Sequence, residues 1–187
     1  MDDDEKKQGA DVNGYPVLGK TEDAKNFEDC LFVLAVGSSK NYYVRKKIFG
    51  KLGFDLNRFA TIIHPNSTVS RNSSVGYGTV LLAGTRVMPN TIIGNHVLVL
   101  SNVYIGHDDV IQDFVTITNS VAVCGITTIK EGCYIGANSS IKERIIVGKW
   151  SLVGLGAVVL KDVSPFSVVV GNPGRVLKKQ DPSLFDA

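Results

Sequence analysis

A strict six-residue repeat of branched aliphatic residues dominates the middle of this chain. Seventeen consecutive positions, six residues apart, hold only Val, Ile or Leu, with no insertion between them. A mostly small or β-branched residue stands two positions before each of them. A fixed period of six residues is typical of a parallel β-helix. The repeated positions are Ile63, Val69, Val75, Leu81, Val87, Ile93, Val99, Ile105, Ile111, Ile117, Val123, Ile129, Ile135, Ile141, Val147, Val153 and Val159.

Each hexad predicts one short strand followed by a bend, with the aliphatic side chain pointing into a narrow core. β-Branched residues suit this buried, pleated setting. Three hexads close one triangular coil, so equivalent positions recur every 18 residues (three times six). Seventeen hexads therefore give about 5.7 coils, and at ~4.8 Å per coil the prism is about 27 Å tall.

Composition excludes several classes of function. The chain has 187 residues, 44% of them hydrophobic, which is enough to bury a sizeable core. Its 20 basic residues nearly balance its 18 acidic residues, so the charge does not indicate nucleic acid or an acidic membrane as partner. No apolar run reaches the ~18 residues of a membrane span, and the first residues do not resemble a signal peptide. Three cysteines without metal-type spacing (Cys30, Cys124 and Cys133) predict reduced thiols and a cytoplasmic protein.

The chain on either side of the repeat follows different patterns. Leu31–Val36 predicts a buried parallel strand, and residues 41–52 predict a helix that Gly53 ends. Together they indicate a truncated α/β, Rossmann-like piece over residues 1–58, lacking a first strand and a glycine-rich loop. The solenoid domain is expected over residues 59–187. It ends in one more strand at Ser167–Val170, a turn, and a tail from Val176 that is helical at its start.

The three histidines do not predict a metal site. His64 precedes Pro65 at the entrance to the repeat, which favours a structural role. His96 and His107 lie eleven residues apart, which is about 220° around an 18-residue coil, so they cannot share a metal within one chain. We therefore expect no metal.

His107 is the candidate for chemistry. It follows Gly106 at a predicted corner and precedes Asp108, and a histidine oriented by a carboxylate suits general-base work near neutral pH. In steps of 18 its column continues through Gly125, Glu143 and Lys161. The Gly125 N–H is placed to bind an oxyanion, and Lys161, about 14 Å above, is placed to bind the phosphate end of an extended thiol ligand. The alternative is a surface histidine at a corner whose glycine serves the turn.

Three segments resemble one enzyme family. They are the repeat with Ile105–Ile111, the ending Val168–Val176, and the N-terminal motifs Asp2-Asp3-Asp4, Gly14–Gly19 and Leu34–Gly37 followed by Arg45-Lys46-Lys47. The chain thereby resembles the hexapeptide-repeat acyltransferases, and within them the family of sialic acid O-acetyltransferases and bacillosamine or perosamine N-acetyltransferases.

This resemblance implies a left-handed β-helix that forms homotrimers and binds acetyl-CoA between neighbouring subunits. It implies that an amine or hydroxyl of a sugar or nucleotide sugar attacks the thioester directly, with His107 as general base and Asp108 orienting it. The backbone of Gly125 would bind the thioester carbonyl. The residues that it implies along acetyl-CoA are Gly136, Ala137, Gly154, Leu155, Asn172 and Arg175, and those for the nucleotide of the acceptor are Asp2, Asp3, Val36 and Gly37.

The chain departs from the family pattern at two positions besides the missing N-terminal elements. Thr116 stands where some members carry a second histidine, and Leu100 stands where many carry asparagine. Two other classes remain open: a hexapeptide acyltransferase with serine or a lipid-A sugar as acceptor, and a non-catalytic β-helix.

Overall fold

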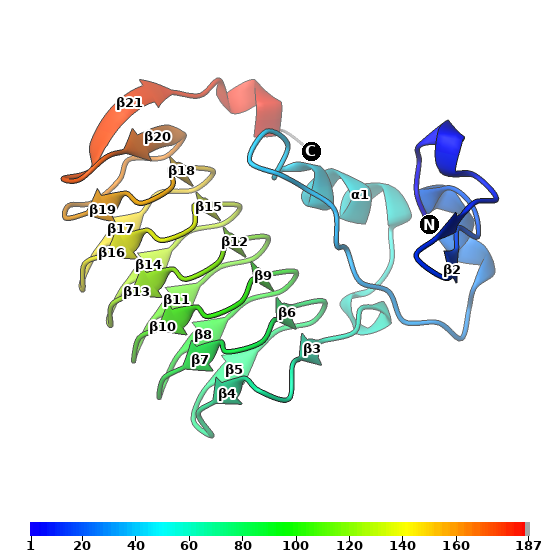
Figure 1. The fold of residues 1–187 in the computed structure, drawn as a ribbon, viewed down its shortest axis with the longest axis horizontal. Helices are drawn as coiled ribbons and strands as arrows, with labels where there is room; N and C mark the ends of the chain where they lie inside the picture. The colour runs from blue at the N-terminus through cyan, green and yellow to red at the C-terminus, as the bar shows by residue number, and fades with distance from the viewer. Residues whose placement is uncertain (186–187) are drawn as a thin grey trace.

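A parallel β-solenoid forms most of the molecule (Figure 1). The computed structural model describes residues 1–185. Seventeen two-residue strands, from β3 (Ile62–Ile63) to β19 (Val158–Val159), follow one another at intervals of six residues. They stack into about six turns, which confirms the predicted mainly-β solenoid and fits a left-handed β-helix.

The strands lie on three faces of a triangular prism, and paired residues from β3 to β19 are 18 positions apart, as in Tyr104 with Ala122. The first face holds β3, β6 (Val80–Leu81), β9 (Leu98–Val99), β12 (Thr116–Ile117), β15 (Tyr134–Ile135), β18 (Leu152–Val153), β20 (Ser167–Val170) and β21 (Arg175–Lys179). The second face holds β4 (Thr68–Val69), β7 (Arg86–Val87), β10 (Tyr104–Ile105), β13 (Ala122–Val123), β16 (Ser140–Ile141) and β19. The third face holds β5 (Ser74–Val75), β8 (Ile92–Ile93), β11 (Val110–Ile111), β14 (Thr128–Ile129) and β17 (Ile146–Val147).

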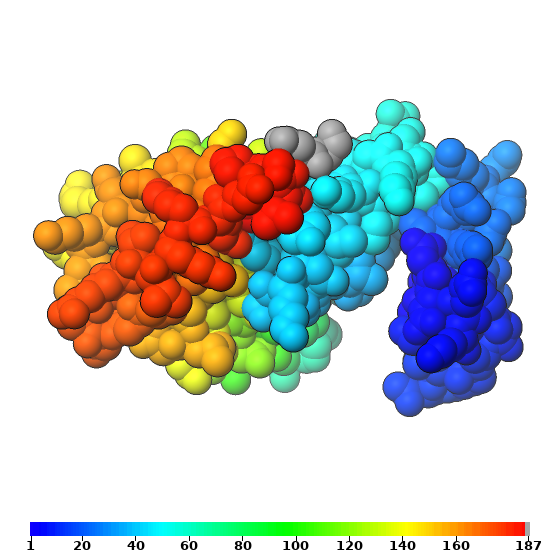
Figure 2. Space-filling view, turned by 90° about the horizontal axis from the view of Figure 1, so that it is seen from above, coloured from blue at the N-terminus to red at the C-terminus, as the bar shows by residue number. Residues whose placement is uncertain are grey.

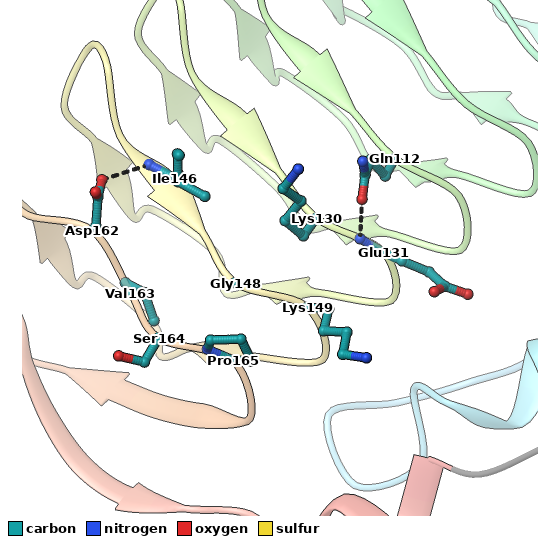
Figure 3. Close-up of a pocket in the computed structure, with 10 residues that line it drawn as sticks. All are labelled: Gln112, Lys130, Glu131, Ile146, Gly148, Lys149, Asp162, Val163, Ser164 and Pro165. Atoms are coloured by element: carbon teal, nitrogen blue, oxygen red, sulfur yellow. Dashed lines mark hydrogen bonds between the residues drawn. The ribbon is translucent and has the colours of Figure 1, made fainter.

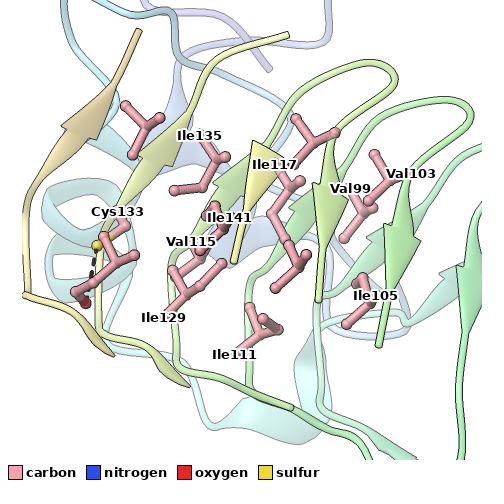
Figure 4. Close-up of a cluster of buried hydrophobic side chains, with 14 of the residues drawn as sticks. Val99, Val103, Ile105, Ile111, Val115, Ile117, Ile129, Cys133, Ile135 and Ile141 are labelled. Carbon is pink, nitrogen blue, oxygen red and sulfur yellow. Dashed lines mark hydrogen bonds between the residues drawn. The ribbon is translucent and has the colours of Figure 1, made fainter. Parts of the chain in front are cut away.

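The aliphatic repeat forms the core of the prism (Figure 4). Ile105, Ile111 and Ile117, one from each face of the same coil, are fully buried. Ile63, in the first coil, is 42% exposed because no complete coil lies beneath it. The inward register that the repeat predicts is therefore present along the whole solenoid.

The end of the chain closes the top of the solenoid. β20 pairs with β18 in parallel and confirms the strand predicted at Ser167–Val170. After the turn at 171–174, β21 pairs with β20 as an antiparallel strand. The prediction that the tail is helical at its start is wrong. The open edge of β20 has unpaired backbone N–H and C=O groups, and β21 pairs with them as a strand, whereas a helix would leave them unpaired. A short 3₁₀ helix, η4 (Pro182–Phe185), follows, and positions 186–187 of the predicted tail lie outside the described residues.

The predicted helix is present as α1 (Val44–Leu52). It begins three residues later than expected because Asn41 takes part in a turn, where its side-chain oxygen accepts the Ser38 N–H at 2.7 Å. Gly53 ends the helix as predicted: its φ of 62° is left-handed, and its N–H donates to Phe49 O.

The predicted strand at Leu31–Val36 is not formed, and the Rossmann-like piece is not seen among residues 1–185. Phe32 makes only an isolated parallel bridge to Phe59. A buried parallel strand needs partner strands on both sides. Here Phe32 and Leu34 instead pack in the same hydrophobic cluster as Leu52 of α1. The remaining elements are η1 (Glu5–Lys7), the hairpin of β1 (Asp11–Val12) and β2 (Tyr15–Pro16), η2 (Thr21–Asn26) and η3 (Leu56–Arg58).

α1 joins the solenoid at the corner between the third and first faces. The buried Arg45 side chain donates from Nη2 to Phe114 O at 2.8 Å and to Thr116 Oγ1 at 2.9 Å, and the Tyr42 hydroxyl donates to Trp150 O at 3.0 Å. Figure 2 shows the first part of the chain (blue) as a lobe on the far side of the α1 segment from the solenoid. None of the helices in residues 1–185 has the length and apolar character that crossing a bilayer requires.

Candidate active site

His107 lies at the corner between the second and third faces, between β10 and β11. Its Nδ1 is 2.7 Å from Asp108 Oδ2, and both side chains are about half exposed. Asp108 adopts a left-handed φ of 57°, a conformation that aspartate tolerates better than most residues. The sequence-predicted pair is therefore in contact at a solvent-accessible edge.

The carboxylate of Asp108 is held in its ionised form. The hydrogen bond with His107 lowers the pKa of Asp108, and a second bond from the Asn90 amide, at 3.1 Å on the coil below, lowers it further. An ionised carboxylate only accepts, so Nδ1 of His107 carries the hydrogen and Nε2 carries the free lone pair. This is the tautomer that a general base acting through Nε2 requires.

Gly125 lies directly above His107, as the 18-residue column predicts. A Cβ atom on Gly125 would lie 2.8 Å from His107 Nε2 and 2.9 Å from His107 O, so only glycine leaves this space free. Ile126 N donates to His107 O at 2.9 Å and holds the two coils together. Within residues 1–185, no hydrogen bond occupies the Gly125 N–H. Nε2 of His107 therefore lies beside a glycine whose N–H is not used in hydrogen bonding within the described residues.

Lys161, three coils above His107, lies near the predicted phosphate-binding residues. It lines a hollow of about 360 Å³ together with Arg175, Val169 and Pro173. Asn172 is joined to Pro173 by a cis peptide bond in the turn beside this hollow. The structure thus places Lys161 and Arg175 along one hollow at the top of the solenoid.

The other residues expected along acetyl-CoA lie at a different corner. Gly136 and Ala137 follow β15, and Gly154 and Leu155 follow β18, so all four stand between the first and second faces. They stack on one another, since a Cβ on Gly136 would meet Gly154 C at 2.7 Å, and Leu155 is 77% exposed. One side of the prism separates them from His107, so a single chain does not bring the two groups together.

The residues expected to bind the acceptor do not share one site either. Asp3 accepts the Thr21 N–H at 2.7 Å, which lowers its pKa, and it lines a hollow of about 480 Å³ with Lys20, Lys25 and Lys51. Asp2 instead pairs with Lys7 at 2.8 Å, and this bond lowers the pKa of Asp2.

Val36 and Gly37 precede the turn that leads into α1. Gly37 has a φ of 132°, and a Cβ there would approach Tyr42. Neither residue lines the hollow that Asp3 lines.

The other two histidines have structural surroundings. His96 is buried and stacks on Phe114 at 5.1 Å, with Phe49 and Phe59 also against its ring, and burial lowers its pKa to about 4. His64 Nδ1 accepts the Asn66 N–H at 3.1 Å. In the part of the chain that the structure describes, no group of three or more His, Cys, Asp or Glu could hold a metal ion.

Two features near the site were not predicted from the sequence. A hollow of about 430 Å³ lies on the third face near the top, and Figure 3 shows Lys130, Lys149 and Ile146 among the residues that line it. Asp109 is fully buried under the histidine corner. The signal for Asp109 was available, since it occupies a repeat position where Thr91 and Thr127 stand in the coils below and above.

Comparison with known proteins identifies relatives of the whole chain. A scan of protein-family models finds no match. The acetyltransferase domain of PglB from Neisseria gonorrhoeae FA1090 is 32% identical, with a TM-score of 0.83, and the match covers 93% of this chain and 84% of that one. It has also been solved with acetyl coenzyme A. WeeI from Acinetobacter baumannii AYE is 31% identical, with a TM-score of 0.78, over 91% and 82% of the two chains.

One curated relative, like these structures, matches nearly the whole chain. GDP-perosamine N-acetyltransferase from Escherichia coli O157:H7 is 29% identical over 94% of this chain and 81% of its own length. The match to the acyl-carrier-protein-dependent UDP-N-acetylglucosamine O-acyltransferase of Sinorhizobium fredii, at 29% identity, spans only 40% of that protein's length. The similarity to the N-acetyltransferases runs through the solenoid and the N-terminal segment alike, and the chain belongs to the hexapeptide-repeat sugar N-acetyltransferase family.

Proposed function

We propose that this protein transfers the acetyl group of acetyl-CoA to an amino group of a nucleotide-linked sugar, with His107 as general base. The observation that carries the proposal is the corner where Nδ1 of His107 contacts Asp108 and Nε2 lies beside Gly125. The similarity to a PglB domain solved with acetyl coenzyme A, and to GDP-perosamine N-acetyltransferase, supports the donor and the class of acceptor. A sugar hydroxyl is the other acceptor that the same geometry serves.

The reaction follows from the groups at this corner. Nε2 of His107 removes a proton from the acceptor amine as the nitrogen forms a bond to the thioester carbon. The carbonyl oxygen gains negative charge and receives a hydrogen bond from the Gly125 N–H. The carbon–sulfur bond then breaks, and the departing thiolate takes the proton from the His107 imidazolium. Asp108 stabilises that imidazolium while it exists.

A complete donor site needs a second copy of the chain. His107 and Gly125 stand at one edge of the second face, and Gly136 and Leu155 stand at the other. In a closed ring of three copies, the first edge of one subunit meets the second edge of its neighbour. We therefore propose a homotrimer of left-handed β-helices, with the pantetheine arm between subunits and the phosphates near Lys161 and Arg175.

We further propose that residues 1–58 form the part that holds the nucleotide of the acceptor. The hollow lined by Asp3, Lys20, Lys25 and Lys51 supports this, because lysines suit a diphosphate and a carboxylate suits a ribose hydroxyl. The second face and its two edges would then serve acetyl-CoA, and the N-terminal lobe would serve the acceptor.

A thiol-release assay with a panel of nucleotide-linked amino sugars tests the function. We expect CoA release that depends on the sugar, with a product heavier by one acetyl group in mass spectrometry. Serine and UDP-N-acetylglucosamine, the latter with acyl-carrier-protein donors, test the rival acyltransferase classes. Turnover with serine alone would contradict the sugar acceptor, and the absence of turnover with every acceptor, combined with no acetyl-CoA binding, would favour a non-catalytic β-helix.

Titration in parallel separates the two substrates. Because Val36 and Gly37 do not line the hollow that Asp3 lines, we expect the nucleotide sugar to bind more weakly than acetyl-CoA. Equally tight binding of the nucleotide sugar would show that the N-terminal lobe as it stands suffices.

A further inference from the structure

A ladder of hydroxyl side chains runs inside the corners of the solenoid. These residues stand two positions before the aliphatic residue in many of the hexads, and several of them donate to the backbone carbonyl 15 residues later. Ser139 and Thr127 donate instead, or also, to the carbonyl three residues earlier. Ser73 Oγ donates to Met88 O at 2.8 Å, and Thr79 Oγ1 donates to Gly94 O at 2.8 Å. Thr91 Oγ1 donates in the same way to Gly106 O at 2.6 Å.

Members of the ladder also accept a hydrogen bond from the coil above. Ser73 Oγ accepts the N–H of Thr91 at 3.1 Å, and Thr79 Oγ1 accepts the N–H of Val97 at 3.0 Å, in each case 18 residues later. The hydroxyls of Ser73 and Thr79 therefore each accept one bond and donate another. A residue at this position needs one acceptor and one donor to satisfy both neighbours.

Asp109 occupies the ladder position directly under the candidate active site. It is fully buried, and its Oδ1 accepts the Thr127 N–H at 2.8 Å, which is the accepting half of the pattern. Its other oxygen, Oδ2, has no hydrogen-bond partner among residues 1–185. The carbonyl 15 residues later is that of Cys124. A carboxylate cannot donate to a carbonyl, whereas a neutral carboxylic acid can.

The Cys124 carbonyl has room for this donor. It already accepts Thr127 Oγ1 at 2.6 Å, and a carbonyl oxygen has two lone pairs. The same double acceptance occurs elsewhere in the solenoid, where Leu82 O accepts Ser67 Oγ at 2.8 Å and Thr85 Oγ1 at 2.7 Å.

We propose that Asp109 is a neutral carboxylic acid whose Oδ2–H donates to Cys124 O, and that it thereby positions the peptide unit that carries the Gly125 N–H. Cys124 C=O and Gly125 N–H belong to one peptide group. Hydrogen bonds accepted by the carbonyl fix the direction of the N–H and polarise it into a stronger donor. Asp109 is thus a positioning residue for the oxyanion site, and this part of the proposal rests on the proposed function of Gly125.

The electrostatic surroundings agree with a neutral acid. Burial raises the pKa of Asp109 to about 7, against the lowering effects of the Thr127 and Gly106 backbone N–H groups. The titratable groups that face it are His107 and Asp108 on its own corner and Cys124 on the coil above, which Glu143 also faces. The only one of these groups that can carry a positive charge is His107, when it is protonated. An ionised Asp109 would therefore have no permanent positive charge among these groups to stabilise it.

A neutral Asp109 makes the stability of the fold decrease as the pH rises. Because the pKa of Asp109 is higher in the folded chain than in the unfolded one, its contribution to stability is present below about pH 4 and is lost as the pH rises through about 7. Ionisation would also place a negative charge behind the peptide that receives the oxyanion. We therefore expect kcat to fall above neutral pH because Asp109 ionises.

Three variants test this. Asp109→Asn keeps an acceptor and a donor in the same shape, Asp109→Thr installs the residue that the ladder uses elsewhere, and Asp109→Leu removes both groups. We expect Asp109→Leu to lower kcat by at least about 10-fold, up to the 10²–10³-fold that loss of one oxyanion donor costs, with KM for acetyl-CoA changed less. The Asn and Thr variants should recover most of this loss and should lack the fall in kcat above neutral pH.

Carbon-13 NMR of aspartate-labelled protein tests the protonation without any reference to catalysis. One carboxyl signal, absent from Asp109→Asn, should be that of a neutral acid at about pH 6 and should titrate near neutrality. The Tm of Asp109→Asn relative to wild type should rise by several degrees between about pH 5 and pH 8.

An ionised Asp109 signal at pH 6, or Asn and Thr variants as impaired as Asp109→Leu, would overturn the proposal. If Asp109→Leu does not fold, the NMR signal and the Asn and Thr variants still decide. Failure of the proposed function would appear as absent acetyl transfer in wild type, with the NMR result intact.

Discussion

Gly125→Ala is the smallest change that probes the geometry of the proposed site. The added Cβ would lie 2.8 Å from His107 Nε2, 3.0 Å from its Cδ2 and 2.9 Å from its backbone oxygen. Ordinary contacts begin near ~3.4 Å, so the imidazole must move by roughly 0.6 Å or more. The ring is more than half exposed and is free to move outward, away from the space above Gly125.

The expected effect is therefore on rate rather than on folding. A displacement of this size in a general base costs about 10- to 10²-fold in kcat, or about 1.4–2.7 kcal/mol in the activation barrier. The contact with the His107 carbonyl oxygen requires a small backbone shift, which we expect to lower the free energy of unfolding by about 1–2 kcal/mol.

Single-turnover acetyl transfer, alongside denaturant unfolding, measures both quantities. Gly50→Ala, in α1, is the matched control: a Cβ there meets nothing within 4 Å, so its rate should equal wild type and its stability should rise slightly. A Gly125→Ala variant that turns over at the wild-type rate would refute the inference that the acceptor, the thioester and His107 meet at this glycine.

Three further predictions concern the scaffold. Ile117 is fully buried, so Ile117→Asp should prevent folding by placing an unpaired charge in the core, whereas Ile117→Val should cost only about 0.5–1.5 kcal/mol; a soluble, folded Asp variant would contradict the register. Arg45→Met should leave Phe114 O and Thr116 Oγ1 without their donor, lower the free energy of unfolding by about 2–4 kcal/mol and speed hydrogen exchange in α1; unchanged exchange would mean that Arg45 does not hold the helix. Sedimentation equilibrium should give a trimer, since the highly exposed Leu155 and the divided donor site need a partner, and a stable monomer at micromolar concentration would contradict this.

The solenoid could be predicted because its information is local and repeated. The inward-pointing position recurs every six residues. The burial of Ile117 can therefore be predicted by counting along the sequence, without knowing which distant residues it contacts. The strand expected at Leu31–Val36 failed for the opposite reason. An apolar run of that length is compatible with a buried strand and with an irregular segment packed on a helix. Which of the two forms depends on long-range contacts such as the isolated bridge of Phe32 with Phe59, and the sequence does not show these.

The same distinction applies to the site. His107 and Gly125 are 18 residues apart, so their contact could be predicted from the period. Gly136 and His107 are 29 residues apart, which is not a multiple of 18, and the period alone would have placed them at different corners. The contact of Arg45 with Thr116 could not be predicted, because it depends on where α1 packs against the prism.

Replacement of His107 measures the central claim most directly. His107→Ala should lower kcat for acetyl transfer to the true acceptor by roughly 10²–10⁴-fold, the usual contribution of a positioned general base. Because the side chain is exposed and outside the core, acetyl-CoA affinity and unfolding should stay close to wild type. Turnover by His107→Ala at the wild-type rate would mean that His107 is only a corner residue and that the catalytic account of this chain is wrong.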